Sequence, residues 1–431
     1  MASIKESPRL LTLPTEILLT ICTHLDQSSL SRLTRTNHPL HSITTPELYR
    51  HIHIKNHKAD GFTAAITKYP SLANHVLSLT VHYHREYEPD DDPQFLYAEA
   101  LAPTLARLPR LRTLIIKGTN FRDRYQYDIE AAGIENLDHA EFVNLTEAWK
   151  EQGREVAVFQ EVFLKSGMGE VLAGLRTCEL NFSDRAPWDL AKRSAVFLHP
   201  TLKRLSILGG YMEDFNWFDE KHRHTTALEE LTFLSCHIEP RALRKVLAVP
   251  KGLQRFTLKG AGGQLRHHSH PERRPYMKAI EQQVHILQAL DLSFPFPTSD
   301  VASAVTLHSF PKLEDIAIST RLLEHGSGTG PGEQSIPPKY SPFPGTVKKL
   351  HFFDPHRRYT GTEGDEVYLS AIARWVASGD LPGLTEIAFT SRDGMFPDGV
   401  GDTLPGTKVV IRRRTPPSGS FPEIDCWCCR F

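Results

Sequence analysis

The spacing of hydrophobic residues divides the chain into an amino-terminal helical segment and a longer segment of recurring strand-like units. Near the amino terminus, Ile17, Ile21 and Leu25 lie four positions apart, and Leu18 and Cys22 widen the same stripe. Residues three or four positions apart share one face of a helix. The spacing therefore predicts an amphipathic helix in this segment.

Two further short helices are predicted before residue 55. Pro14 suits the first turn of the first helix, and residues 26–28 are expected to end it and to cap a second helix that carries Leu30 and Leu33. Residues 44–47, Thr-Thr-Pro-Glu, have the spacing of a capping box and are expected to begin a third helix. Three helices this short bury too little apolar surface to be stable alone, so we expect another part of the chain or another protein to cover them.

After residue 70 the dominant pattern is apolar-x-x-apolar-x-apolar, which is typical of a short strand. It occurs ten times, with first apolar positions at Val76, Leu111, Leu175, Leu202, Leu228, Leu253, Leu287, Leu313, Val347 and Leu384. From Leu175 onward the intervals between these positions lie between 25 and 37 residues. Random occurrences of so short a pattern would not cluster in this way, so the spacing predicts a repeat architecture.

Helical patterns lie between several of these predicted strands. They cover residues 97–108, 241–249 and 367–377, as a strand-plus-helix repeat requires. The longer interval between Leu111 and Leu175 is expected to contain a degenerate unit and a helical insertion at residues 136–161. A doubly wound α/β enzyme would also alternate strands and helices, and stays the competing fold at this point.

The amino-terminal residues carry a family resemblance. The segment LPTEILLTICTHLDQSSLSRLTRTNHPL, followed by ELYRHIHI, resembles an F-box, in particular the fungal-type F-box, although Thr36-Asn37 departs from the family pattern. The resemblance implies a three-helix unit that docks on the Skp-type adaptor of a cullin-based ubiquitin ligase. By motif it assigns adaptor contacts to Leu13, Pro14, Ile17, Leu18, Leu25, Leu30 and Leu33. An ordinary helical cap packed on its own chain is the alternative.

The later units are similar to leucine-rich repeats in spacing. The unit at residues 228–238 fits the fuller repeat pattern, with Cys236 where a side chain closes the backbone turn after the strand. The expected fold is therefore α/β: a three-helix F-box at residues 10–55, then a curved leucine-rich-repeat-like solenoid with one parallel sheet at 56–415. Insertions are expected near 120–165 and 324–345, and a carboxyl-terminal tail at 416–431.

Composition excludes several functional classes. The 431 residues are 40% hydrophobic and 23% charged, and 50 Lys and Arg balance 51 Asp and Glu to a net charge of -1. No overall field would attract nucleic acid or an anionic membrane, so neither is an expected partner. Three of the six cysteines stand alone in apolar stretches, and the chain lacks the pattern of a signal peptide or a membrane-spanning helix. We expect a cytoplasmic or nuclear protein, or one present in both compartments.

Motifs for catalysis or cofactor binding are missing from the sequence. The glycine-rich segments 260–263 and 326–332 lack the context of a phosphate-binding turn, and no zinc-protease or nucleophile-elbow motif occurs. His267, His268 and His270 have no further ligand at metal-binding spacing. The sequence therefore predicts a protein that is not an enzyme and needs no metal or cofactor.

The carboxyl terminus allows two minor expectations. Residues 409–411 form a possible last edge strand, with the arginines at 412–414 discouraging further pairing. The final residues place Cys428 fourth from the end, as prenylation requires, but Arg430 occupies a position where that signal prefers an aliphatic residue. Membrane association is expected only if Cys428 is prenylated, and a plain tail is the favoured interpretation. Cys426 and Cys429 also leave metal or redox chemistry open.

These observations together predict a substrate-recognition subunit of an SCF-type ubiquitin ligase, with the Skp adaptor, through it a cullin, and a substrate protein of unknown identity as partners. An F-box scaffold acting outside any ligase is the alternative. In the predicted strands, Leu205, Ile207, Leu231 and Phe233 should point inward. The predicted substrate surface is the concave face, with Arg204, Ser206, Glu230, Thr232, Arg255, Thr257, Lys259, Asp291, Asp315, Lys349 and His351.

Overall fold

The computed structural model describes most of the chain outside its long loops. The described residues are 12–55, 59–82, 101, 103–117, 162–163, 165, 171–181, 188–189, 194–212, 219–260, 273–293, 305–319, 322–323, 340–353, 363–390, 402–404 and 407–414. They form two compact units, with the boundary after residue 179. Several expected features lie outside the described residues: the insertion at 136–161, both glycine-rich segments, the histidines at 267–270 and the terminal cysteines.

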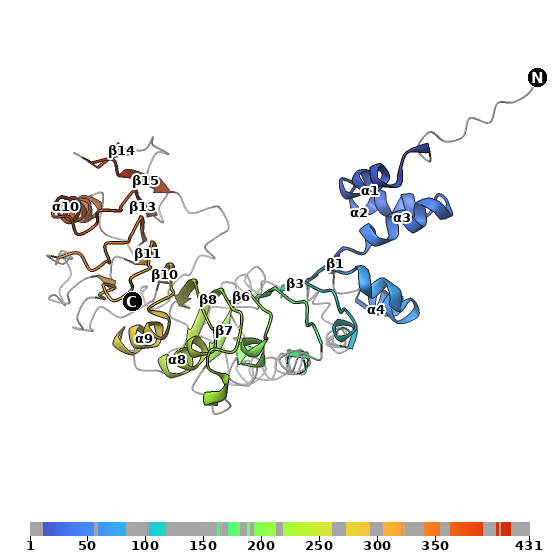
Figure 1. Ribbon diagram of the computed structural model, residues 1–431, viewed down its shortest axis with the longest axis horizontal. Coiled ribbons are helices and arrows are strands. Elements are labelled where there is room, and N and C mark those ends of the chain that lie inside the picture. The colour runs from blue at the N-terminus through green and yellow to red at the C-terminus, as the bar shows by residue number, and fades with distance from the viewer. Residues whose placement is uncertain are drawn as a thin grey trace, which may run out of the picture. The chain divides into compact units, whose positions relative to one another are not determined.

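The first unit begins with three helices (Figure 1). They are α1 (Thr15–Thr23), α2 (Gln27–Thr34) and α3 (His38–Leu48). Asp26 caps α2 as expected, because its carboxylate accepts a hydrogen bond of 2.7 Å from the amide of Ser29. The predicted capping box at 44–47 is wrong, since α3 begins six residues earlier. Its N-cap is Asn37, whose side chain accepts from the amide of Leu40 at 2.9 Å.

Four parallel strands follow in the first unit, in chain order. They are β1 (His51–Lys55), β2 (Ser78–His82), β3 (Thr113–Lys117) and β4 (Thr177–Asn181), with α4 (Ala59–Lys68) and the 3-10 helix η3 (Pro70–His75) between β1 and β2. The amides of Arg176 and Thr177 donate to the carbonyl of Arg112, which places β4 directly beside β3. No other strand therefore lies between β3 and β4, and the degenerate unit expected between them falls outside the described residues.

Eight parallel strands form the sheet of the second unit, again in chain order, as the repeat pattern predicted (Figure 1). They are β6 (Arg204–Leu208), β8 (Glu230–Ile238), β9 (Arg255–Gly260), β10 (Ala289–Ser293), β11 (Asp315–Ser319), β12 (Lys349–Phe353), β13 (Glu386–Thr390) and β15 (Val410–Arg414). The short strand β14 (Asp402–Thr403) pairs antiparallel with β15. β15 is therefore not the edge strand that the sequence predicted.

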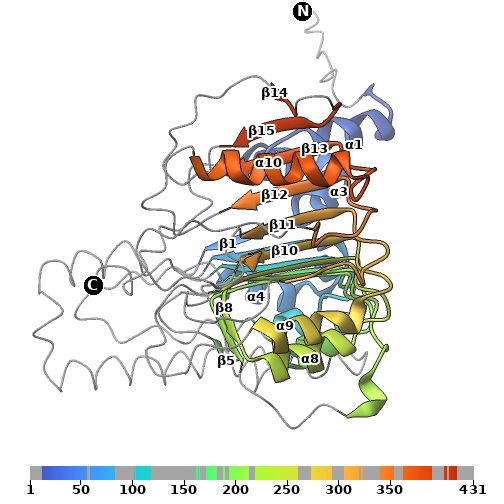
Figure 2. The same ribbon diagram turned by 90° about the vertical axis from the view of Figure 1, so that its left-hand side faces the viewer.

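The helices of the second unit lie on one face of its sheet. They are α8 (Pro240–Ala248), α9 (Arg273–Ile280) and α10 (Glu363–Ala377), and Figure 2 shows α8 and α9 on the same side of the strands. Shorter elements accompany them, namely β5 (Trp188–Asp189), β7 (Gly210–Met212) and the 3-10 helices η5 (Ser194–Leu198), η6 (Glu220–His222) and η7 (Glu281–Gln283). The helical patterns at 241–249 and 367–377 are confirmed by α8 and α10.

The core lies between the sheet and these helices. Leu205, Ile207, Leu231 and Phe233 are each at most 1% exposed, so their predicted inward orientation is confirmed. Phe233 packs edge-on against Phe256 with ring centroids 6.4 Å apart. Because side chains alternate along a strand, the intervening residues emerge on the opposite side, which we call the open face.

Candidate protein-binding surfaces

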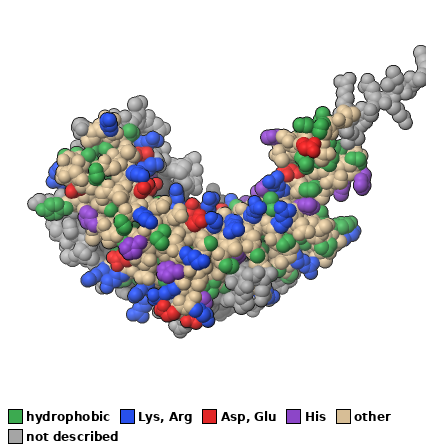
Figure 3. All heavy atoms as spheres, viewed as in Figure 1, with side chains coloured by type: hydrophobic (Ala, Val, Ile, Leu, Met, Phe, Trp, Pro, Cys, Tyr) green, Lys and Arg blue, Asp and Glu red, His purple; other side chains and the backbone are tan. Residues whose placement is uncertain are grey.

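The first candidate surface lies on helix α1. Its inward side chains Leu18 and Cys22 are 5% and 2% exposed and contribute to a small core between the three helices, with Leu30 and Leu40. Apolar residues on the other side of α1 point outward. Leu13, Ile17 and Ile21 are 37%, 48% and 36% exposed, and together they form the α1 apolar patch. Leu19 is 42% exposed, but it lies two positions from Ile17 and Ile21 and therefore on a different side of the helix. Figure 3 shows hydrophobic side chains at the surface of this helical part of the chain.

The residues that the F-box resemblance assigned to adaptor binding differ in their exposure to solvent. Leu13, Pro14 and Ile17 are exposed, and Leu25 and Leu33 are half-buried. By contrast, Leu18 and Leu30 belong to the helical core, where a partner could not reach their side chains without unfolding the unit. Leu19 and Ile21 were missing from the prediction. Periodicity placed Ile21 in a stripe expected to be buried, but it could not indicate which side of an apolar helix faces its own chain.

Short, bonded connections join the three-helix unit to the first strand. Only Tyr49 and Arg50 separate α3 from β1. The guanidinium of Arg50 forms an ion pair of 3.0 Å with Glu47, and its carbonyl accepts hydrogen bonds from Leu77 and Ser78. The side-chain amide of Gln27 in α2 also donates to the carbonyl of His51. The helices and the strand β1 are therefore parts of one packed unit.

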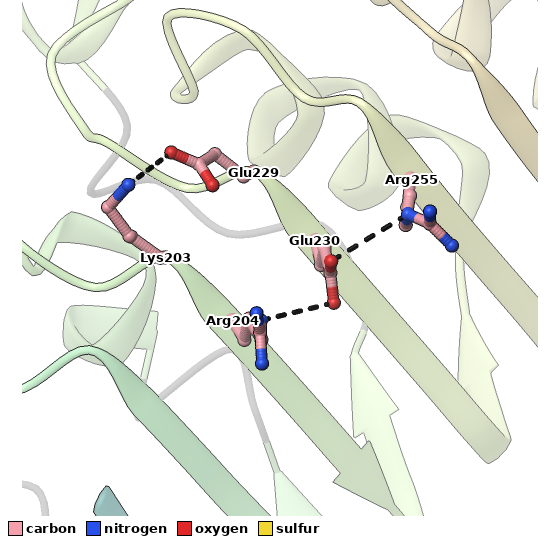
Figure 4. Close-up of polar contacts among 5 residues, drawn as sticks. All are labelled: Lys203, Arg204, Glu229, Glu230 and Arg255. Carbon is pink, nitrogen blue, oxygen red and sulfur yellow. Dashed lines mark hydrogen bonds and ion pairs between the residues drawn. The ribbon is translucent and has the colours of Figure 1, made fainter. Parts of the chain in front are cut away.

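The second candidate surface is the open face of the second unit. Strand register places Arg204 beside Glu230 and Glu230 beside Arg255, and the same row continues through Ala289 to Asp315 and Lys349. We call these residues the charged row. The guanidinium Nε atoms of Arg204 and Arg255 lie 3.5 and 3.7 Å from the two carboxylate oxygens of Glu230, as Figure 4 shows.

A second row on the open face carries short hydroxyl side chains. Ser206, Thr232 and Thr257 occupy matching positions on β6, β8 and β9, and all three are half-buried. We call them the hydroxyl row. Asp291 follows Thr257 in register on β10. All the residues that the sequence predicted on this surface thus lie on one face of one sheet, although a substrate contact at any of them stays a prediction.

Asp291 is a largely buried charge of this face, with its side chain 26% exposed. Its Oδ2 lies 2.9 Å from the ammonium of Lys259, while Oδ1 is buried without a hydrogen-bond partner among the described residues. Burial raises the pKa of the Asp291 carboxyl, and the nearby Lys259 opposes that increase. The Lys259 ammonium also lies 5.5 Å from the centroid of the Phe353 ring, and His351 packs edge-on against the same ring.

The described residues contain no arrangement that suggests metal binding or a membrane span. Within them, no group of three or more His, Cys, Asp or Glu side chains could hold a metal ion. None of the helices in the same ranges is long and apolar enough to cross a membrane.

Comparison with known proteins agrees with the geometry of the amino-terminal helices. Residues 10–55 match the family model described as F-box-like. The chain has no match among curated proteins. The match covers the three helices, the α1 apolar patch and strand β1, and the α/β sheets follow it in the chain. The chain therefore carries an F-box-like domain at residues 10–55.

Proposed function

We propose that this protein is a substrate-recognition subunit of an SCF-type ubiquitin ligase. In this proposal the α1 apolar patch docks on a Skp-type adaptor, and through it on a cullin, while the open face of the second unit binds a substrate protein. The protein would do no chemistry itself. Its contribution is positional, because holding the substrate near the ubiquitin-loaded enzyme raises the effective concentration at the acceptor lysine.

The α1 apolar patch is the observation that carries this proposal. Leu13, just before α1, and Ile17 and Ile21 on α1 expose large apolar side chains along one side, which is typical of a site that another protein covers. They lie in the segment that matches the F-box-like family, whose members generally bind Skp-type adaptors. The finer expectations of a fungal-type F-box and of a leucine-rich-repeat-like solenoid belong to the proposal as well. The parallel strands in chain order and the hydrogen bond from the amide of Gly210 to Sγ of Cys236 in β8 support the repeat part.

A pull-down with purified Skp-type adaptor tests the docking surface. Burying an apolar side chain contributes about 1.5 to 3 kcal/mol, so Leu13→Ala with Ile17→Ala should weaken adaptor binding roughly 10-fold to 1000-fold. Both residues are exposed, so the fold should persist. Tyr69→Ala is the control, because Tyr69 is 53% exposed but lies at the end of α4, outside the matched segment. Unchanged binding by the double variant would refute adaptor docking through this patch.

Co-purification from cells separates the ligase subunit from a scaffold that acts outside any ligase. A ligase subunit should bring down a cullin together with the adaptor, and the Leu13→Ala, Ile17→Ala variant should lose both. Recovery of the adaptor without any cullin would favour the scaffold function.

A further inference from the structure

The two arginines of the charged row present unoccupied hydrogen-bond donors to solvent. Their distances to Glu230, 3.5 and 3.7 Å, exceed those of good hydrogen bonds, and both involve Nε. The side chains of Arg204 and Arg255 are 64% and 66% exposed. Among the described residues, the terminal nitrogens of these two arginines have no hydrogen-bond partner. In Figure 4 these nitrogens extend away from Glu230, which holds both guanidinium groups by charge on their inner side.

The hydroxyl row lies two residues further along the same strands, on the same face of the sheet. Ser206, Thr232 and Thr257 form no side-chain hydrogen bond with any other described residue. Three free hydroxyls in register can donate to and accept from peptide groups of another chain. A main chain laid across β6, β8 and β9 would therefore find hydrogen-bonding groups beside the two guanidinium groups.

The charge changes sign further across the sheet. Asp291 on β10 keeps a buried oxygen without a hydrogen-bond partner in the described part of the chain, and Asp315 on β11 is close enough to raise the pKa of Asp291. Asp315 itself forms no ion pair within the described ranges. Ala289, between Arg255 and Asp315 in the charged row, leaves room for a partner chain to approach the sheet.

We propose that this part of the open face binds an extended protein segment with acidic side chains at the Arg204–Arg255 pair and a basic side chain at Asp291 and Asp315. The proposal rests on the substrate-binding role proposed for the open face and names the chemistry of the substrate. A planar guanidinium binds a carboxylate through two parallel hydrogen bonds, so each arginine provides a specific acceptor site.

Strand spacing sets the expected pattern of charges in the partner. Neighbouring strands are about 4.8 Å apart, so Arg204 and Arg255 are separated by roughly 10 Å, and Arg255 and Asp315 by roughly the same distance. An extended chain advances about 3.3 Å per residue. The two acidic residues should therefore lie two or three positions apart, with the basic residue two or three positions beyond.

A polyanion is a poorer occupant than such a segment. Glu230 lies between the arginines and reduces the charge of this group to +1, and Asp291 and Asp315 would repel further negative groups. Nucleic acid and anionic lipid surfaces carry continuous negative charge and bind to continuous rows of cations. They therefore do not complement a surface on which positive and negative side chains alternate.

Selection of peptides on the purified full-length protein tests the proposal. The probe is a displayed library of random twelve-residue peptides, sequenced before and after selection at low ionic strength. Wild-type protein should enrich peptides that carry two acidic residues followed by a basic residue at the expected spacing. The enrichment should be at least 10-fold relative to peptides with the same residues in scrambled order. Arg204→Glu with Arg255→Glu should abolish enrichment of the acidic positions. Lys221→Glu with Arg223→Glu, on η6, changes the net charge equally and should leave the selection unchanged.

Two results would overturn the proposal. One is absence of acidic enrichment on folded wild-type protein, and the other is equal enrichment on the Arg204→Glu, Arg255→Glu variant. Preferential binding of a single-stranded oligonucleotide or of phosphatidylserine vesicles through these arginines would also contradict it. Thermal unfolding and adaptor pull-down on the same samples report whether the variants fold. Failure of the wild-type protein to bind the adaptor, with intact peptide selectivity, would refute the ligase function alone. Adaptor binding without peptide selectivity would refute this binding site alone.

Discussion

At the scale of single residues, Cys236 shows how one buried side chain satisfies a backbone amide. Its Sγ accepts a hydrogen bond of 3.2 Å from the amide of Gly210 and lies 3.4 Å from the carbonyl of Ile207. Burial raises the pKa of this thiol to about 12. The sequence predicted that Cys236 closes a turn after its strand, whereas Cys236 lies within β8 at a bulge and accepts from the first residue of β7. A buried sulfur there satisfies a backbone amide that would otherwise lack a partner.

Cys236 should resist alkylation in the native protein. A rise in the pKa of the thiol from its ordinary value near 9 to about 12 lowers the thiolate fraction at pH 8 by about 1000-fold. Mass spectrometry after iodoacetamide treatment should find Cys236 labelled only in urea. The raised pKa also means that the unfolded chain loses this proton first, so the free energy of unfolding should fall as pH rises above about 9. Rapid labelling of Cys236 in folded protein would contradict its burial.

Gln283 is a buried polar residue that satisfies three backbone groups. Its Oε1 accepts from the amide of Leu253 at 3.1 Å, and its Nε2 donates to the carbonyls of Leu247 and Pro250. Gln283→Leu would leave these groups buried without partners and should lower the free energy of unfolding by about 2 to 4 kcal/mol. Denaturant titration measures the change. Gln282→Leu, at the half-buried neighbouring position, should have an effect below about 0.5 kcal/mol, and equal effects would argue against the hydrogen-bonded role.

At the scale of elements, helix α3 shows how competing local signals are decided. Asn37 and the Thr44–Glu47 capping box are both acceptable helix starts, and the longer helix forms because Leu40 and Thr44 are then buried against the other helices. Within this helix, the hydroxyl of Thr44 donates to the carbonyl of Leu40 at 2.7 Å. Tertiary burial therefore overrides a local capping signal.

The N-cap of α3 can be tested directly. Asn37→Ala removes the acceptor for the amide of Leu40 and should lower the free energy of unfolding of the first unit by about 1 kcal/mol. Asn37→Ser retains an acceptor and should stay within a few tenths of the wild-type value. Circular dichroism during denaturant titration provides the measurement. A neutral Asn37→Ala variant would show that the helix does not depend on this cap.

At the scale of the whole molecule, charge balance predicts how the protein behaves in solution. The net charge is -1 when the 22 histidines are neutral. The sequence has an isoelectric point of about 7.1, so the net charge becomes increasingly positive as the pH falls from 7 to 6. Light scattering should therefore show the greatest self-association near pH 7 and less at pH 6, because like charges keep molecules apart. Greater association at pH 6 would indicate that specific contacts, not net charge, control it.

The repeat pattern predicted more of the fold than the helical pattern did. All ten predicted strands formed, and their apolar positions are buried. Each strand has helices on one side and solvent on the other, so one side of every strand must be apolar whatever its place in the sheet. Strand β1 was missed, since its sequence HIHIK has too few strongly apolar residues to stand out. The degenerate unit expected between β3 and β4 falls on residues outside the described ranges, and the structure shows that β3 and β4 pair directly.

The sequence by itself determined the alternation of faces along each strand, the order of the parallel strands and the F-box-like segment at the amino terminus. These features depend on residues close together in the chain, or on a motif that occurs intact. Only the tertiary structure decided which side of α1 is exposed, that β4 pairs directly with β3, and that Glu230 lies within ion-pair distance of both Arg204 and Arg255. Those outcomes depend on contacts between residues far apart in sequence, and periodicity holds no information about such contacts.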